Sequence, residues 1–351
     1  MNSGRIIFFC QSASGDNPIV ADTIQRIEAL AARPEITSIS VIELRGKNKP
    51  TTGKISFHVL ETNKGKIRAL VRLYLTMFKI CRSNKIASCY LYMTPTMLPL
   101  FWILKPIFGF RLIAWFAHPN FSLKTRLSLK FFCDKWVSVD RAQVLNYPHV
   151  KIIGQGINTS LFSPMDNEKK YDLITVSRIT PVKKLELIFN AIYLLKQKGR
   201  RVTLLIAGAP YVESDNTYKE GLLELQKKLN IDDQIVWAGS VDRHDLPQYY
   251  SQVRLMVFPI QGGIGKVTVE AFACGIPVII NDSRANEFLG PRLSELFIAS
   301  DDVKTMVEKI ESILDLDKTS YDAVSAECRK LITDHHSLEK FAERLAFEIL
   351  N

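Results

Sequence analysis

Residues 258–277 read FPIQGGIGKVTVEAFACGIP, and this stretch decides how the rest of the chain is interpreted. The apolar run 255–258 predicts a buried strand, and residues 267–274 predict a short helix that ends at Gly275. A glycine-rich turn lies between them. A strand, such a turn and a helix together bring backbone N–H groups and a helix N-terminus up to a phosphate. The residues expected at this turn are Gly262, Gly263, Ile264, Gly265, Lys266 and Val267.

Glu270 follows the turn and is expected in the first turn of the helix. A carboxylate is favoured there by the helix dipole, and it is able to accept hydrogen bonds from ribose hydroxyls. The alternative is an ordinary crossover between a strand and a helix, with glycines that only permit tight turning. Glycine-rich turns are weak signals by themselves, so the local sequence leaves both interpretations open.

The length and composition set the broad class of the protein. A chain of 351 residues with a hydrophobic fraction of 47% is long enough for two domains with separate cores. Six scattered cysteines without metal-ligand spacing favour a reduced, cytoplasmic setting. The N-terminal sequence does not resemble a signal peptide. The longest apolar region, 91–116, is interrupted by prolines and basic residues, which argues against a membrane-spanning helix.

Positive charge is concentrated in the first half of the chain. Residues 1–165 carry 22 Lys and Arg against 8 Asp and Glu, whereas the remainder carries 24 against 28. No acidic residue occurs between Glu61 and Asp134. Because the basic excess belongs to one half and lacks the interleaved aromatic residues of an RNA-binding motif, nucleic acid is not expected as a partner.

The segment 62–85 predicts a basic helix with a broad apolar side. Such a helix suits an anionic membrane surface, and this is the interpretation that we favour. The alternative is a core helix with a solvated basic edge. The residues expected at the membrane are Lys64, Lys66, Arg68 and Arg72.

The first half alternates predicted strands with helical segments, which indicates a doubly wound α/β domain. Its first loop, after the strand 6–10, includes Ser14 and Gly15. Its strand 111–116 is followed by His118. Ligands of open α/β sheets collect at the carboxyl ends of strands, so His118 is well placed for a substrate. A histidine after a strand is also often only a capping or packing residue.

The second half repeats this alternation. The strand 171–177 is followed by Arg178, and Lys183 stands five residues later, before the helix 185–198. Two cations at a strand end and a helix start are able to converge on one anion. The alternative is a pair of solvated basic side chains.

Three segments resemble the retaining family-4 glycosyltransferases, which have the GT-B fold. EAFACGIPVI (270–279) resembles their EAMACGxPVI, SRITPVKK (177–184) resembles GRLxxxKG, and GQGINTSLFSP (154–164) resembles the link NGVDxxxFxP between their domains. Two positions depart from the pattern. Gly262 stands where the family has the first of two glutamates, and Lys184 replaces a glycine. The resemblance is good over about 150–300 and only general before that.

The resemblance implies two Rossmann-like doubly wound domains that face across a cleft. We expect an N-terminal acceptor and membrane-side domain at 1–165, a sugar-nucleotide domain at 166–335, and a C-terminal helix at 336–351 that packs back on the first domain. Arg178 and Lys183 are implied to bind the diphosphate, and Glu270 the ribose. Val241 is implied to border the base, His118 to face the donor sugar, and Ser14 and Gly15 to lie on the acceptor side.

The function implied is transfer of a sugar, with retention, from a nucleoside-diphosphate sugar to an acceptor. The basic first half favours a lipid-linked saccharide or another envelope or polysaccharide precursor, at the cytoplasmic face of a membrane. No cofactor is expected, and no carboxylate pair at a strand end predicts a metal site. Two alternatives remain: a membrane-associated accessory pseudo-glycosyltransferase, because Gly262 lacks the carboxylate, and a sugar-nucleotide epimerase of the same fold.

Overall fold

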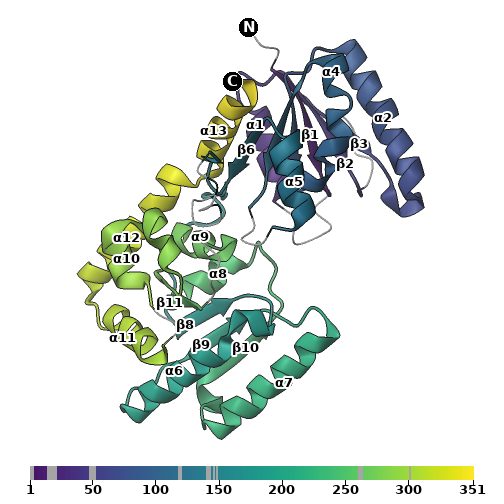
Figure 1. Ribbon diagram of the computed structural model, residues 1–351. Helices are drawn as coiled ribbons and strands as arrows, with labels where there is room; N and C mark the ends of the chain where they lie inside the picture. Colours follow the sequence, from purple (N-terminus) through teal and green to yellow (C-terminus); the bar gives the residue numbers. More distant parts are fainter. Residues whose placement is uncertain are drawn as a thin grey trace. The chain divides into compact units, whose positions relative to one another are not determined.

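The computed structural model describes residues 4–13, 22–46, 53–117, 121–139, 144, 147, 149–259, 264–299 and 302–351. The chain divides into two compact units (Figure 1). The first unit comprises 1–156 and 337–351, and the second comprises 157–336. The division therefore falls between Gly156 and Ile157 and not near residue 165, and the last helix belongs to the first unit.

Within the described residues, the first unit has a seven-stranded sheet in the order β3-β2-β1-β4-β5-β6-β7. Every neighbouring pair is parallel. This order, which reverses at β1, is that of doubly wound dinucleotide-binding folds. The strands are β1 (Arg5–Cys10), β2 (Ser38–Glu43), β3 (Ile55–Val59), β4 (Ser88–Tyr92), β5 (Arg111–Trp115), β6 (Lys135–Ser138) and β7 (Lys151–Ile152).

Helices cover both faces of this sheet. Successive residues of a strand face opposite sides, so Phe8 joins the core beneath α1 and α13, whereas Phe9 joins the core beneath α2, α3 and α5. The helices are α1 (Thr23–Ala31), α2 (Lys66–Ser83), α3 (Leu98–Trp102), α4 (Lys105–Phe108), α5 (Leu123–Phe132) and α13 (Leu338–Leu350), with short 3-10 helices at Thr62–Lys64 and Pro95–Met97.

The C-terminal helix α13 packs beside α1 (Figure 1). Its Phe341 and Leu345 are fully buried in the same core as Leu30 of α1. The last turn is held by two hydrogen bonds to the Ile349 carbonyl oxygen, from Ser88 Oγ and Arg111 Nη2, each 2.6 Å long. The end of the chain is therefore an integral part of the first unit.

The chain crosses between the units twice, after Gly156 and after His336, and Arg26 contacts a residue near each crossing. Its guanidinium is buried, pairs with Asp22, and donates to Tyr92 Oη and to the Gln155 carbonyl oxygen, each at 2.6 Å. The guanidinium carbon also lies 5.5 Å from the centre of the Phe341 ring. Gln155 comes just before the first crossing and Phe341 just after the second, so one side chain fixes both to the first unit.

Five strands of the described chain form the sheet of the second unit, in the order β10-β9-β8-β11-β12 and all parallel. They are β8 (Tyr171–Val176), β9 (Leu204–Ala207), β10 (Ile235–Gly239), β11 (Val253–Phe258) and β12 (Val278–Ile280). The order again reverses at the first strand of the unit, here β8. The prediction of two Rossmann-like parallel-sheet domains is thus confirmed.

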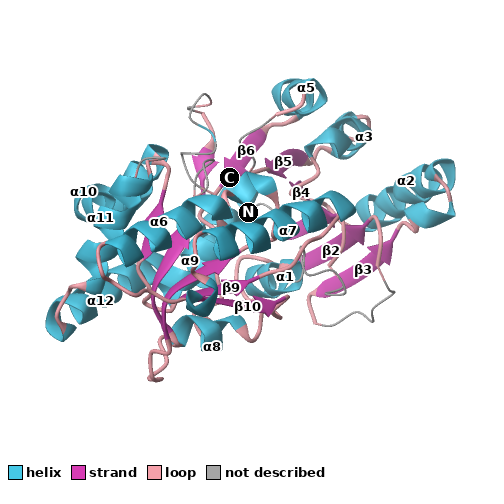
Figure 2. Cartoon of the chain, turned by 90° about the horizontal axis from the view of Figure 1, so that it is seen from below, coloured by secondary structure: helices cyan, strands magenta, loops and turns pink. Residues whose placement is uncertain are grey.

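Helices alternate with the strands in this unit as in the first (Figure 2). They are α6 (Leu185–Gln197), α7 (Glu213–Lys228), α8 (Leu246–Ser251), α9 (Lys266–Ala273), α10 (Asn286–Phe297), α11 (Val303–Leu314) and α12 (Lys318–His335), with 3-10 helices at Pro181–Lys183, Asp232–Gln234 and Ser283–Ala285. The sequence pattern does not indicate α5, α10 or α12.

A glycine brings the loops after β8 and β9 together. Gly208 has φ +159°, and a Cβ atom there would lie 1.7 Å from the Ser177 carbonyl oxygen. Any side chain at this position would force the two loops apart. The close approach sets the backbone directly before Arg178.

Candidate functional site: cations at the strand-order reversal of the second unit

The central strands β8 and β11 of the second unit define the candidate site. From β8 the chain proceeds outward through β9 and β10, and it then returns to add β11 and β12 on the other side. In open α/β sheets, ligands bind outside the carboxyl ends of the strands at such a reversal. The loop after β8 carries Arg178 and Lys183, and the loop after β11 carries the glycine-rich turn.

Lys183 lies against the end of β11. Its Nζ atom is 5.5 Å from the centre of the Phe258 ring, and Phe258 is the last residue of that strand. Burial lowers the pKa of Lys183, and the positive charge of Arg178 lowers it further. The structure therefore brings the two predicted cations close enough to repel each other, which is the arrangement expected of a site that receives an anion.

Arg178 is supported by the loop that precedes α7. Its guanidinium carbon lies 5.6 Å from the centre of the Tyr211 ring. Asp215 fixes this loop, because its Oδ2 atom accepts the Tyr211 and Val212 N–H groups at 3.1 and 3.2 Å. Burial acts to raise the pKa of Asp215, but these bonds, the Thr180 hydroxyl and the charge of Arg178 together lower it. Arg178 remains exposed, with its charge available to a ligand.

Lys184 explains a departure from the family pattern. It adopts the left-handed conformation, with φ 48° and ψ 42°, immediately before α6. Glycine adopts this conformation without the steric cost that other residues incur. A glycine at this position in the resembling sequences therefore fits the same backbone turn, and Lys184 maintains the turn here.

The described part of the glycine-rich turn packs tightly. Ile264 is buried, and a Cβ atom on Gly265 would lie 3.0 Å from the Phe258 ring. Gly265 is the N-cap of α9, whose first two residues, Lys266 and Val267, are half-buried. Lys183 and Gly265 thus contact the same phenylalanine. Gly262 and Gly263 lie outside the described residues.

Glu270 lies deeper than the sequence predicts. Because α9 begins at Lys266, Glu270 is in its second turn and not its first. Only 2% of its side chain is exposed, and its Oε1 atom accepts a hydrogen bond of 2.8 Å from Arg243 Nε. Arg243 also lies over Phe162, with 5.3 Å between the guanidinium carbon and the ring centre. The predicted ribose ligand is therefore a buried member of an ion pair.

Arg243 is a site residue that the sequence does not indicate. It follows Val241, the residue expected near the base, in the loop between β10 and α8. Arg243 Nη2 is buried and has no hydrogen-bond partner among the described residues. Arg243 lies in a polar loop, and its carboxylate partner is 27 residues away in the sequence. No local sequence pattern therefore indicates the pair.

Two further sets of predicted residues remain. Ser14, Gly15 and His118 lie outside the described residues. Lys64, Lys66, Arg68 and Arg72 belong to the first unit, at or just before α2, and Lys64 and Arg72 both pair with the Glu61 carboxylate. In the described ranges, no three His, Cys, Asp or Glu side chains gather as a metal site. Metal independence remains a prediction.

Comparison with known proteins places this site in a family. Residues 157–332 match the family model described as glycosyl transferases group 1. A lipopolysaccharide core biosynthesis mannosyltransferase, LpsB, of Rhizobium meliloti (strain 1021) is 26% identical over 224 residues, 58% of this chain and 61% of that protein. A GDP-mannose-dependent alpha-(1-6)-phosphatidylinositol monomannoside mannosyltransferase of Mycobacterium tuberculosis (strain CDC 1551 / Oshkosh) is 24% identical over 212 residues, 54% of this chain and 53% of that one.

The chain thus spans between half and two thirds of the length of these relatives. Among solved structures, Anabaena Alr3699/HepE in complex with UDP is similar with a TM-score of 0.76. The match covers 98% of this chain and 99% of that one at 14% sequence identity, and it establishes a common fold.

Proposed function

The chain belongs to the glycosyl transferases of group 1, and from this premise we propose that it is a retaining glycosyltransferase that uses a nucleoside-diphosphate sugar. The observation that carries the proposal is the convergence of Arg178 and Lys183 where the strand order of the second unit reverses. A diphosphate is the anion that two such cations fit best, since it offers several oxygens to both. The relatives support a sugar nucleotide, because the mycobacterial enzyme is named as GDP-mannose-dependent and HepE was solved with UDP.

The reaction is the departure of a nucleoside diphosphate from the anomeric carbon. The bond from that carbon to the phosphate oxygen breaks, and Arg178 and Lys183 stabilise the negative charge that develops. The acceptor hydroxyl oxygen forms the new bond on the same face. Because the new bond forms on the face that the diphosphate leaves, the configuration is retained, and the hydroxyl proton passes to a departing phosphate oxygen. No protein base is needed on this route, and the two cations act at the position where a metal would otherwise neutralise the diphosphate.

A lipid-linked acceptor is supported by the outer surface of the first unit. Of the eighteen exposed large hydrophobic side chains found among the described residues, ten lie on the helices α2 to α5 and an eleventh, Ile103, lies between α3 and α4. We call this surface the outer face. Its members are Ile67, Leu70, Val71, Leu75, Phe78, Trp102, Ile103, Ile107, Leu123, Leu127 and Phe131. Exposed apolar side chains in such number, beside basic ones, are typical of a surface that binds a membrane.

Ring contacts join these helices into one layer. Phe78 of α2 meets Phe108 of α4 with 5.1 Å between ring centres, and Trp102 of α3 meets Phe132 next to Phe131 of α5 at 5.6 Å. The layer packs on the sheet with its inner side, so its second apolar side faces outward. No helix in the described part of the chain is both long and apolar enough to cross a membrane. We therefore propose peripheral binding, at the cytoplasmic face.

The experiment for this proposal combines donor binding with product analysis. The chain is incubated with GDP-mannose, UDP-glucose and other sugar nucleotides in excess chelator, and its melting temperature is recorded. A ligand that binds only the native state at one hundred times its Kd adds about 2.7 kcal/mol of stability. We expect one nucleotide class to stabilise the chain without metal and its sugar to appear on a lipid acceptor with the donor's anomeric configuration.

The alternatives give different results in the same experiment. An accessory protein without activity would bind or ignore the nucleotide but would never transfer or release sugar. An epimerase would release an altered sugar in the absence of any acceptor. Inversion at the anomeric carbon would contradict the retaining mechanism, and strict dependence on magnesium or manganese would contradict the proposed role of the two cations.

A further inference from the structure

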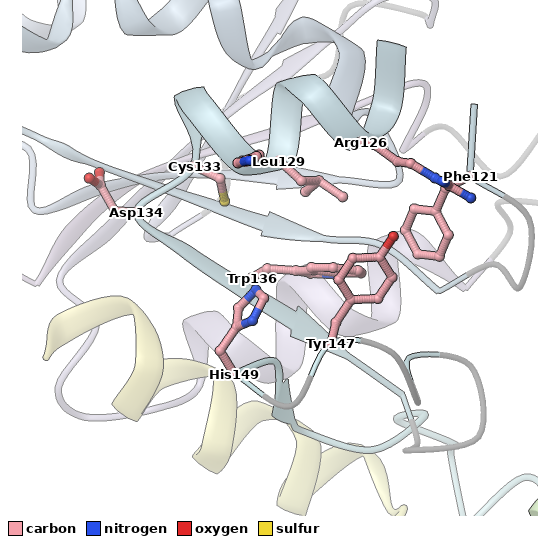
Figure 3. Close-up of a pocket in the computed structure, with 9 residues that line it drawn as sticks. Phe121, Arg126, Leu129, Cys133, Asp134, Trp136, Tyr147 and His149 are labelled. Carbon is pink, nitrogen blue, oxygen red and sulfur yellow. The ribbon is translucent and has the colours of Figure 1, made fainter. Parts of the chain in front are cut away.

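A cavity is lined by residues of the first unit alone, whereas the candidate diphosphate site belongs to the second. It has a volume of about 560 Å³, within the range of roughly 300–1,000 Å³ for ligand pockets. Figure 3 shows Leu129 of α5 projecting into it from one side and Trp136 of β6 with Tyr147 on the other. We call it the α5 cavity, after the helix that supplies Arg126, Leu129 and Lys130 to its lining.

The wall opposite α5 is made of aromatic rings. The centres of the Trp136 and Tyr147 rings lie 4.9 Å apart, and Phe121 lies 5.3 Å from Trp136. The indole N–H of Trp136 already donates to the Phe116 carbonyl oxygen at 3.1 Å. Trp136 therefore offers the cavity hydrocarbon surface and no free donor, so this wall favours an apolar ligand.

The charged residues that line the cavity differ in whether their charge is already paired. Arg126 and Lys130 are exposed and have no ion-pair partner among the described side chains. Asp134 is engaged, because it pairs with Lys105 and its Oδ2 atom accepts the Leu112 N–H at 2.7 Å. In Figure 3 Asp134 points away from the ring cluster. The cavity thus joins an apolar wall to two available positive charges.

The position of the two cations on α5 connects the cavity with the outer face. Leu123, Leu127 and Phe131 repeat every four residues and form an exposed stripe on α5, with 71%, 44% and 60% of each exposed. Leu129 is buried on the cavity side. With 3.6 residues per turn, positions 126 and 130 fall between the stripe and Leu129. The cations therefore stand at the border between the proposed membrane surface and the cavity.

We propose that the α5 cavity holds the first hydrocarbon units of a lipid-linked acceptor, with its phosphate paired to Arg126 and Lys130. The inference rests on the proposed function, in which the acceptor is lipid-linked. A saccharide fits the described lining less well, because the neutral polar side chains there are limited to Tyr147 and His149 and the carboxylate is already engaged. Two exposed cations beside a wall of rings match a phosphate that carries an apolar chain.

The test uses the full chain and farnesyl monophosphate, with binding measured by calorimetry in the absence of detergent. Arg126→Gln with Lys130→Gln should weaken binding roughly 10-fold to 100-fold, because two charge-assisted contacts are lost. The matched control is Lys227→Gln with Lys228→Gln, which removes two exposed charges at the end of α7 in the second unit and should leave the affinity unchanged. Inorganic phosphate should bind weakly to every variant, since it lacks the chain.

A second variant tests the hydrocarbon part. In the wild type, affinity should rise from methyl to geranyl to farnesyl phosphate. Leu129→Trp should fill the space and abolish this dependence on chain length. Equal farnesyl phosphate binding by the wild type and the Arg126/Lys130 variant would overturn the inference, as would glucose 1-phosphate binding as tightly as farnesyl phosphate. Nucleoside diphosphate binding, measured in parallel, reports on the second unit, so failure here is distinguishable from failure of the proposed function.

Discussion

Glu270 and Arg243 form an ion pair in which the carboxylate is buried, so each residue should contribute to folding stability. Arg243→Ala would leave the Glu270 carboxylate buried without its guanidinium, which costs about 3 kcal/mol of folding stability. Replacing both residues with Gln removes the stranded charge and should restore most of the melting temperature. Thermal unfolding of the three chains tests this, and a double variant no more stable than Arg243→Ala would disprove the coupling.

The ribose role of Glu270 has its own test. Glu270→Gln keeps the size of the side chain but weakens its hydrogen bonds to hydroxyl groups. We expect a loss of roughly tenfold in affinity for a nucleoside diphosphate, and none for inorganic pyrophosphate, which has no ribose. Calorimetry with the nucleoside diphosphate and with pyrophosphate measures the two affinities. An equal loss for both would assign Glu270 to the fold or to the diphosphate instead.

Lys183 should make diphosphate binding sensitive to alkaline pH. Burial and the charge of Arg178 hold its pKa below the ordinary 10.5, so the side chain loses its charge at a lower pH than an exposed lysine. Binding of an anion favours the charged form. Affinity for ADP, whose base does not titrate in this range, should therefore fall as the pH rises through this lowered pKa. Lys183→Arg stays charged and should bind equally across the range, whereas parallel curves for both chains would exclude Lys183 from the site.

At the residue level, the sequence predicts those site residues that stand at a characteristic distance from a strand or helix. Arg178 and Lys183 are predicted as site residues because each occupies a fixed position relative to a strand end or helix start. Lys184 appears only as a substitution for glycine, and its left-handed backbone is visible only in the structure. Arg243 is not predicted, because its meaning depends on a contact with a residue far along the chain.

Among the elements, α5 shows how periodicity fails where apolar side chains are exposed. Its exposed positions are Leu123, Leu127 and Phe131, whereas Thr125 and Ser128 are buried. Exposed apolar residues and buried hydroxyl residues on one helix blur the usual amphipathic pattern. The pattern of α2 is clearer, since Leu73, Met77 and Ile80 are buried on its inner side.

α2 also shows that the two sequence interpretations of 62–85 are compatible. It is a core helix on its inner side, as the alternative held, and it presents Ile67, Val71 and Leu75 outward, as a membrane surface requires. Lys64 and Arg72 share the Glu61 carboxylate, so their charges are partly offset. Lys66 and Arg68 are exposed, with no ion pair to any described residue, and should contribute more of the attraction.

Binding to an anionic membrane should depend more on Lys66 and Arg68 than on the paired Lys64 and Arg72. Lys66→Gln with Arg68→Gln should weaken binding to anionic vesicles roughly 10-fold to 30-fold, at about 1 kcal/mol for each charge. High salt should have the same effect on the wild type. Co-sedimentation with anionic and neutral vesicles measures both, with Lys227→Gln/Lys228→Gln, two exposed charges at the end of α7, as the control. Equal binding to both kinds of vesicle, or to neither, would contradict the electrostatic account.

In the whole molecule, the two units differ in composition and in the chemistry they present. The first half of the chain is strongly basic and carries the outer face, whereas the second is slightly acidic and brings Arg178 and Lys183 together. The alternation of strands and helices is enough to predict two doubly wound units, because local periodicity encodes it. The boundary after Gly156 is not predictable in this way, since contacts such as that of Arg26 with Gln155 join distant parts of the chain.

If Arg178 and Lys183 stabilise a departing diphosphate, kcat/KM for sugar transfer should depend on both side chains. Arg178→Ala and Lys183→Ala should each lose about 2–4 kcal/mol of transition-state stabilisation, a decrease of roughly 30-fold to 1,000-fold. Lys219→Ala is the control, because Lys219 lies over Trp237 at 5.6 Å much as Lys183 lies over Phe258, and it should keep its activity. Turnover near that of the wild type by both Arg178→Ala and Lys183→Ala, at limiting and at saturating donor, would contradict the account.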